Sequence, residues 1–166
     1  DPRQVSRAVD LLRRSRRVVC MGQGSSMVLS EEAWTLFSTV SPKFLFVPDS
    51  HLQMNTLALM DPDELVLFFS YSGSTRDFQD LLEVARQRQV KVVLVSRFPK
   101  SPGGQLADVV LQCGADEGPL QAGSVNARMA QLFVLDVLFQ EFCMRAPEET
   151  EQSREQIAEA VARKHL

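Results

Sequence analysis

Short apolar runs alternate along the chain with longer segments in which apolar residues recur every three or four positions. Each run ends at a glycine, a proline or a polar residue, which is typical of a buried strand. The pattern therefore predicts five strands, at residues 17–21, 43–47, 65–69, 91–95 and 107–111.

The segments between and after these runs have the periodicity of helices that pack on one side. In the first segment, Val5, Ala8, Val9 and Leu12 fall on one helical face. The polar stretch after the fourth run contains prolines and adjacent glycines, and it predicts a loop. Helices are predicted at residues 3–15, 26–39, 49–59, 75–87, 124–145 and 148–164.

Strands that alternate with helices require a parallel sheet covered by helices on both faces. Right-handed crossovers limit the topology to a doubly wound arrangement. We therefore predict an α/β fold, a three-layer αβα sandwich with a five-stranded parallel sheet. Among the common strand orders we select 2-1-3-4-5, the flavodoxin-like order. A chain of 166 residues fits one domain, with a core at about 1–146 and a C-terminal helix at 147–166.

Composition and charge narrow the possible partners. Apolar residues make up 45% of the chain and charged residues 23%, as in ordinary globular proteins. The net charge of −3 argues against nucleic-acid binding by this chain alone, because such domains usually present a basic surface. The basic cluster at residues 13–17 is interpreted as a solvated helix end, where cations suit the helix dipole.

Neither the cysteines nor the hydropathy of the chain indicates a metal site, a disulfide framework or a membrane span. The three cysteines form no CxxC pair, so neither a disulfide framework nor a zinc site is expected. There is no signal peptide and no apolar run long enough to span a bilayer, so we expect a cytoplasmic protein. Because the chain lacks an initiator methionine and enters a helical pattern at once, we expect a fragment of a longer chain.

In a sheet of this kind, ligands bind beyond the carboxyl ends of the strands, where the strand order reverses. That point lies between strands 1 and 3. The loop after strand 1 has the sequence Gly-Gln-Gly-Ser-Ser at residues 22–26. Its glycines let the backbone approach a ligand, but a tight strand-to-helix turn explains the sequence equally well. Met27 stands where a dinucleotide-binding loop would have its third glycine.

The loop after strand 3 offers several hydroxyl groups around one glycine. A turn needs the glycine and one helix cap, but not so many hydroxyls. Free N–H groups at the start of the next helix attract an anion, and hydroxyls add further donors. A P-loop lysine is absent, so we predict a monophosphate held without metal or cofactor. The residues predicted to hold the phosphate are Ser70, Ser72, Gly73, Ser74 and Thr75.

The two loops together resemble the SIS (sugar isomerase) domain family. The shared patterns are GxGxS at residues 22–26 and SxSGxT at residues 70–75, and the resemblance extends from about residue 18 to about residue 142. It implies that the second loop holds the phosphate of a phosphosugar. It also implies that Gly24, Ser25 and Ser26 contact the sugar and that the fold is a five-stranded parallel αβα sandwich.

Two shorter sequences resemble the sugar-binding domain of RpiR-type bacterial transcription regulators. They are Asp-Ser-His-Leu-Gln at residues 49–53 and Ala-Arg-Met-Ala-Gln-Leu at residues 127–132. Those regulators carry a helix-turn-helix domain, then a linker helix, then the SIS domain. The resemblance implies that residues 5–17 open the SIS domain and that the DNA-reading domain lies upstream, outside this chain.

The same resemblance adds two candidate sugar contacts. His51 follows strand 2, where a surface or capping role weighs equally with a binding role. Glu117 lies in the loop after strand 5, where SIS proteins often place a carboxylate against the sugar; a solvated loop acid is the alternative. In isomerases such a carboxylate is the base that moves a proton between neighbouring carbons.

Two functions are weighed on these residues. The first is the effector domain of a transcription regulator, in which a sugar phosphate changes dimer geometry and operator affinity. The second is an aldose–ketose phosphosugar isomerase, for which only Glu117 and His51 are candidate acid–base groups. We favour the sensor, which is not an enzyme. A phosphosugar lyase or etherase should need a longer chain.

The long helix predicted at 124–145 carries more apolar residues than one sheet face needs. We expect Phe133, Val137, Phe139 and Phe142 to pack against a second copy, since SIS domains commonly dimerise. The expected partners are thus a phosphorylated sugar and further copies of this chain. DNA is expected only through the upstream domain.

Overall fold

Five short strands form one parallel sheet at the centre of the computed structural model, which describes residues 1–114 and 124–162. Their order is β2-β1-β3-β4-β5, which confirms the predicted fold class and strand order. Within β1, β3 and β4 nearly every residue is buried, as the unbroken apolar runs require. The strands are β1 (Val18–Gly22), β2 (Phe44–Phe46), β3 (Leu65–Phe69), β4 (Lys91–Ser96) and β5 (Val109–Gln112).

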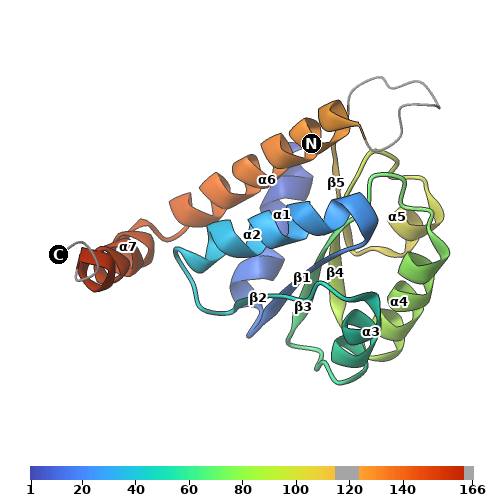
Figure 1. The fold of residues 1–166 in the computed structure, drawn as a ribbon, viewed down its shortest axis with the longest axis horizontal. Helices are drawn as coiled ribbons and strands as arrows, with labels where there is room; N and C mark the ends of the chain where they lie inside the picture. Colours follow the sequence, from blue (N-terminus) through green and yellow to red (C-terminus); the bar gives the residue numbers. More distant parts are fainter. Residues whose placement is uncertain (115–123, 163–166) are drawn as a thin grey trace.

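Helices cover both faces of the sheet, which makes the three-layer sandwich visible in Figure 1. One face is covered by α1 (Pro2–Arg14), α2 (Met27–Ser38) and α6 (Val125–Met144). The other face is covered by α3 (Ser50–Ala58), α4 (Arg76–Gln87) and the short α5 (Pro102–Leu106). Each helix layer forms its own apolar core with alternate residues of the strands, because successive strand side chains point to opposite faces.

The core under α2 and α6 is built on aromatic rings, and it corrects one expectation. The ring of Phe37 stacks on Phe44 at 4.3 Å and meets Phe139 and Phe142 edge-on, each at 5.3 Å between centroids. Phe139 and Phe142 are buried. They therefore fill this core, and the expectation that they pack against a second copy is wrong. Phe133 and Val137 remain exposed.

Helix α7 (Pro147–Ala162) extends beyond the sandwich at the end opposite α5 (Figure 1). Among its described residues only Thr150 is buried. The Thr150 hydroxyl lies 3.4 Å from the carbonyl oxygen of Cys143, and Glu149 pairs with Arg13 at 3.0 Å. No helix in the described part of the chain is long and apolar enough to cross a membrane.

The segment after β4 departs from the predicted loop, because it contains α5. Its N-cap is Ser101, whose hydroxyl accepts a hydrogen bond from the N–H of Gly104 at 3.1 Å. Pro102 suits the first turn of a helix, but the two glycines that follow disfavour one. A helix of five residues has too little periodicity to be recognised from sequence.

Only part of the basic cluster at residues 13–17 is a helix end: Arg13 and Arg14 lie in the last turn of α1, whereas Arg16 and Arg17 follow the helix and pair with a buried acid. Arg17 donates to Oε2 of Glu64 at 2.8 Å, and Arg16 Nη2 lies 3.0 Å from Glu64 Oε1. The Glu64 side chain is only 1% exposed. The parallel pairing of β1 with β3 places residues 16–17 beside the turn that precedes β3. Arg16 and Arg17 therefore join the starts of β1 and β3.

We expect Glu64→Ala to lower the free energy of unfolding by about 2 kcal/mol, because it leaves part-buried donors of Arg17 and of the Asp61 backbone without their acceptor. Urea denaturation followed by circular dichroism measures this change. The matched control is Asp63→Ala, which removes a more exposed acid paired with Arg16 and should behave as an ordinary surface substitution. Equal losses in the two variants would contradict this account.

Candidate functional site

The register of the sheet brings the two predicted loops to the same edge. Gly22, the last residue of β1, pairs with Phe69, the last residue of β3, and Phe69 pairs with Val95 of β4. The loops that follow these strands therefore begin side by side at the same edge of the sheet. The chain turns to one side from β1 into β2 and to the other side from β3 into β4, so this edge is the switch point where ligands of such folds bind.

A pocket of about 290 Å³ lies between the two loops. That volume is near the lower end for small-molecule sites. Six of the residues predicted for the site line this pocket, three from each loop: Gly24, Ser25, Ser26, Ser70, Ser72 and Thr75. The remaining lining residues are Gln23, Phe68, Phe69 and Tyr71.

Two helices start at this pocket without a side-chain cap. Thr75 is the N-cap residue of α4 and Ser26 that of α2, and neither hydroxyl makes a capping hydrogen bond. At α4 the first N–H groups have no partner inside the helix. At α2 the short 3-10 helix η1 (Gly24–Ser26) precedes the start, and the N–H groups of Ser26 and Met27 donate to the carbonyl oxygens of Gln23 and Gly24. The helix dipole makes both ends positive. The pocket therefore combines two positive helix ends with hydroxyl donors, which is the chemistry that holds a phosphate.

The loop at 70–75 has its shape set by Ser70 and Gly73. Ser70 is buried, and its hydroxyl oxygen accepts a hydrogen bond from the N–H of Gly73 at 3.2 Å. Gly73 has a φ of +61°, and a Cβ added there would lie 2.2 Å from the hydroxyl oxygen of Ser101. Any other residue at this position would have a strained backbone, and its Cβ would overlap the Ser101 side chain, so the loop requires glycine.

The segment between β4 and α5 supports this loop from the other side. The Ser96 hydroxyl donates to the carbonyl oxygen of Tyr71 at 3.1 Å, and the Arg97 N–H donates to the same oxygen at 3.0 Å. The Gly103 N–H donates to the carbonyl oxygen of Gly73 at 2.9 Å. These hydrogen bonds could not be predicted from the sequence, because a serine or glycine in a polar stretch carries no signal of which distant residue it will contact.

Ser74 has a different place from the other loop hydroxyls. Its hydroxyl donates to the carbonyl oxygen of Ser72 at 3.0 Å, and Ser74 does not line the 290 Å³ pocket. It faces a neighbouring cavity of about 760 Å³, which Ser72 also lines. Arg97 and Lys100 lie on the wall of that cavity.

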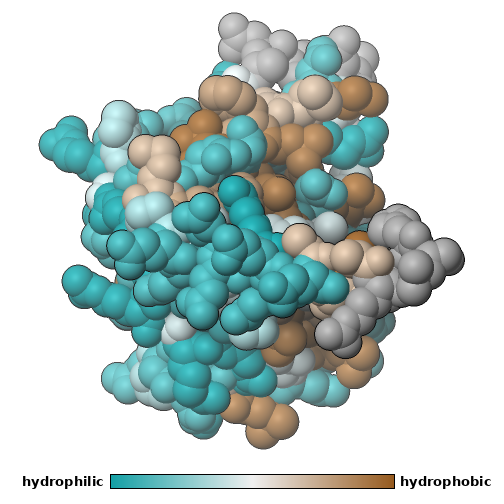
Figure 2. Space-filling view, turned by 90° about the vertical axis from the view of Figure 1, so that its left-hand side faces the viewer, coloured by the Kyte–Doolittle hydropathy of each residue, from teal (hydrophilic) through white to brown (hydrophobic). Residues whose placement is uncertain are grey.

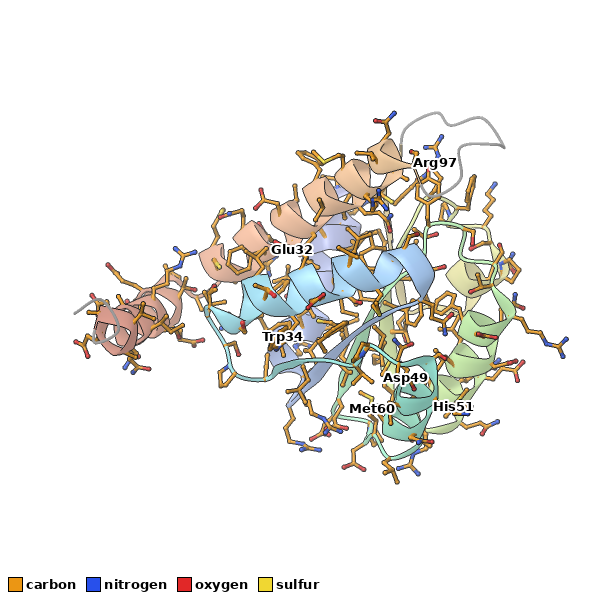
Figure 3. All side chains as sticks on the ribbon, in the orientation of Figure 1. Glu32, Trp34, Asp49, His51, Met60 and Arg97 are labelled. Atoms are coloured by element: carbon orange, nitrogen blue, oxygen red, sulfur yellow. The ribbon has the colours of Figure 1, made fainter. Side chains whose placement is uncertain are left out.

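The structure does not bring His51 into the pocket. His51 is exposed in the first turn of α3, next to the cap residue Asp49, and is not among the described residues that line the pocket. Figure 3 shows His51 beside α3, well separated from Arg97 at the edge where β4 ends. Glu117 lies outside the described residues.

Among the described residues the cysteines are buried and take part in no group that could hold a metal ion. In the described ranges no three His, Cys, Asp or Glu side chains gather in a way that could hold a metal ion. Cys20, Cys113 and Cys143 are free and buried. Burial raises the pKa of the Cys113 thiol to about 11, so this thiol stays protonated at neutral pH.

Comparison with known families agrees with this geometry. The SIS domain model matches residues 11–141. The chain therefore belongs to the SIS domain family, as the two loop sequences indicate.

The sequence relatives described next are both HTH-type transcriptional regulators. The chain is 29% identical over 140 residues to the uncharacterized HTH-type transcriptional regulator YbbH of Bacillus subtilis, covering 84% of this chain and 50% of the relative. It is 27% identical over 136 residues to the HTH-type transcriptional regulator RpiR of Escherichia coli K12, covering 82% and 46%. The chain thus spans about half the length of the curated relatives it matches.

Solved structures share the fold over nearly the whole chain. NanR of Vibrio vulnificus, complexed with ManNAc-6P, superposes with a TM-score of 0.90 at 25% identity, covering 98% of this chain and 61% of NanR. The sugar isomerase domain of an RpiR transcription factor from Sphaerobacter thermophilus superposes with a TM-score of 0.85 at 22% identity, covering 96% and 87%.

Proposed function

We propose that this chain is the effector domain of a bacterial RpiR-type transcription regulator and that it binds a sugar phosphate. The observation that carries the proposal is the pocket between residues 22–26 and 70–75, where two uncapped helix starts face hydroxyl side chains. The similarity to HTH-type regulators and to NanR, a protein complexed with ManNAc-6P, supports it.

The phosphate would sit against the start of α4. The hydroxyls of Ser72 and Thr75 are exposed at the pocket, and Ser70 holds the loop in shape. A monophosphate suits this seat, because its charge is met by helix N–H groups and neutral hydroxyls. The loop sequence has no P-loop lysine to reach a second and third phosphate.

The sugar would extend from the phosphate towards the loop at 22–26. Gly24, Ser25 and Ser26 line that side of the pocket. His51 and Glu117 remain proposed sugar contacts. Because His51 is exposed and lies off the described pocket wall, its contact would need a ligand longer than the pocket or a change in the position of α3.

As an effector domain, the chain would act through parts that it does not contain. A sugar phosphate changes a regulator only if it binds two states of the dimer with different affinity. We propose that a helix-turn-helix domain upstream reads DNA in the cytoplasm. The chain itself, with a net charge of −3, would contact the ligand and a second copy.

An aldose–ketose phosphosugar isomerase is the second candidate. A putative sugar-phosphate isomerase from Listeria monocytogenes shares the fold with a TM-score of 0.81, but at 17% identity this likeness concerns the fold alone. An isomerase needs a positioned base, and none of the described residues that line the 290 Å³ pocket is acidic or a histidine. We therefore favour the sensor.

The second copy would pack against the outer side of α6. Val125, Met129, Phe133 and Val137 are exposed there and follow one another at intervals of four, so they lie on one side of the helix. Figure 2, which views the molecule from the end at which α7 lies, shows apolar surface gathered in its upper part, at the height where α6 runs in Figure 1. An exposed apolar stripe of this kind is typical of an interface.

Ser72→Ala combined with Thr75→Ala should weaken phosphosugar binding by about 1.5–3 kcal/mol for each charge-assisted hydrogen bond removed. Isothermal titration calorimetry with ManNAc-6P and other phosphosugars measures the change. Ser74→Ala is the matched control, since its hydroxyl bonds within the loop. A loss of affinity in Ser74→Ala alone would place the anion in the 760 Å³ cavity instead.

The bound sugar phosphate should not be turned over. We expect NMR spectra of phosphosugars incubated with the protein to stay unchanged, since the described pocket wall offers no acid–base pair. Glu117→Gln is the decisive variant. Steady isomerisation by the natural chain that disappears in Glu117→Gln would reject the sensor in favour of the enzyme.

Phe133→Asp should raise the dissociation constant of the homodimer by about tenfold or more, because a charge would replace an apolar contact at the centre of the stripe. Sedimentation velocity over a range of concentrations measures this constant. Leu59→Asp is the control, since Leu59 is 79% exposed just after α3 on the opposite helix layer. If the natural chain is monomeric at all concentrations, or if both variants dissociate it equally, this surface is not the interface.

A further inference from the structure

Gln53 is a fully buried polar side chain at the point where β1 and β2 end. Its exposed fraction is 0%. The amide nitrogen Nε2 donates to the carbonyl oxygen of Gly22 at 3.0 Å and to that of Val47 at 2.8 Å. Gly22 is the last residue of β1 and opens the loop at 22–26, and Val47 directly follows β2. One side-chain amide therefore joins the carboxyl ends of two neighbouring strands.

The orientation of this amide is fixed by its partners. Both are carbonyl oxygens, so only the NH₂ group can face them. The Oε1 atom then points the other way, where it is buried and has no hydrogen-bond partner in the part of the chain that the structure describes. An acceptor buried without a partner destabilises the fold, because it loses its hydrogen bonds to water and forms none within the protein. Leucine would fill the same space without that cost, so the two donated hydrogen bonds are what this residue supplies.

The bond to Gly22 acts where the loop is tightest. A Cβ added to Gly22 would lie 2.6 Å from the carbonyl oxygen of Ser26, so the loop folds back closely on its first residue. A hydrogen bond that holds the Gly22 carbonyl therefore sets the direction in which residues 23–26 leave the strand. These residues form the side of the pocket opposite the phosphate loop.

The same side chain also ties α3 to this loop. The backbone N–H of Gln53 donates to the carbonyl oxygen of Asp49 at 2.8 Å, and the Asp49 carboxylate accepts from the backbone N–H of Leu52 at 2.9 Å. The first turn of α3 is thus held by its own hydrogen bonds, and the side-chain amide of Gln53 links this turn to the end of β1. The loop at 70–75 has a separate set of supports, from Ser96 and Gly103.

We propose that Gln53 is a positioning residue that holds the loop at 22–26 in its binding conformation, independently of the phosphate loop. Its removal should loosen the sugar side of the pocket and leave the phosphate side in place. The effect on sugar-phosphate affinity rests on the function proposed above. The effect on the order of the loop does not.

Hydrogen exchange followed by mass spectrometry tests the proposal without any ligand. In Gln53→Leu, amide exchange in peptides covering residues 22–26 should rise by about tenfold, the effect of losing the hydrogen bond to the carbonyl oxygen of Gly22. Exchange in peptides covering residues 70–75 should stay unchanged. Gln53→Glu keeps the shape but buries a carboxyl group that cannot donate to both carbonyl oxygens, so exchange at 22–26 should rise at least as much as in Gln53→Leu.

The chain offers a matched control in Gln131. This residue is 1% exposed, its Oε1 atom also lacks a partner among the described residues, and its Nε2 atom donates within α6 to Ala127 at 3.3 Å. Gln131→Leu therefore changes a buried amide away from the loops. It should leave exchange at 22–26 unchanged. Unchanged exchange at 22–26 in Gln53→Leu, or an equal rise over the whole sheet, would overturn the proposal.

Binding provides the second readout. Calorimetry with ManNAc-6P and with inorganic phosphate should show about tenfold weaker binding of the sugar phosphate in Gln53→Leu, but less than about twofold for phosphate. Equal losses for both ligands would mean that Gln53 supports the fold as a whole, and would also overturn the proposal. If the natural chain binds neither ligand, the proposed function fails, and the exchange result still decides the role of Gln53.

Discussion

The parallel pairing of β1 with β3 is the constraint on which the candidate site depends. It aligns Gly22 with Phe69, so that two loops distant in sequence begin side by side at one edge of the sheet. Both loops lead directly into helices, and both helices start without a side-chain cap. A shift of the pairing by one residue would turn every side chain of one strand to the other face. Because both faces of β1 and β3 are buried, no polar–apolar alternation specifies this register, and it depends on how the side chains pack in the two cores.

The pocket has two walls that are held in different ways. The phosphate loop is fixed by Ser70, by the left-handed backbone at Gly73 and by hydrogen bonds from the segment after β4. The loop at 22–26 is held at its first residue by the amide of Gln53. The 22–26 wall also contains the short 3-10 helix η1 (Gly24–Ser26), which begins with a hydrogen bond from the Ser26 N–H to the carbonyl oxygen of Gln23 at 3.1 Å.

Most of the fold was predictable because its signals are local. Apolar runs that end at glycine, proline or serine identified the strands, and spacing by three and four identified the helices that cover them. The predictions failed where the signal is weak or the partner is distant. Helix α5 has five residues and two glycines, and so resembles a loop. Phe139 and Phe142 look like surplus apolar residues until Phe37 and Phe44 are placed against them. The arginines at 16 and 17 pair with Glu64 only because β1 lies next to β3.

The sequence by itself determined the alternation of strands and helices, the two glycine- and serine-rich loops, and membership of the SIS family, because each of these is a local pattern of residue types. Only the tertiary structure decided which hydroxyls share a pocket, that Ser74 faces a different cavity, and that His51 lies outside the described pocket wall. It also placed the amide of Gln53 against the carbonyl oxygens of Gly22 and Val47, whereas in the sequence Gln53 is one polar residue in a helix. The physical reason is that hydrogen bonds between residues far apart in the chain depend on strand order and register, which no short segment contains.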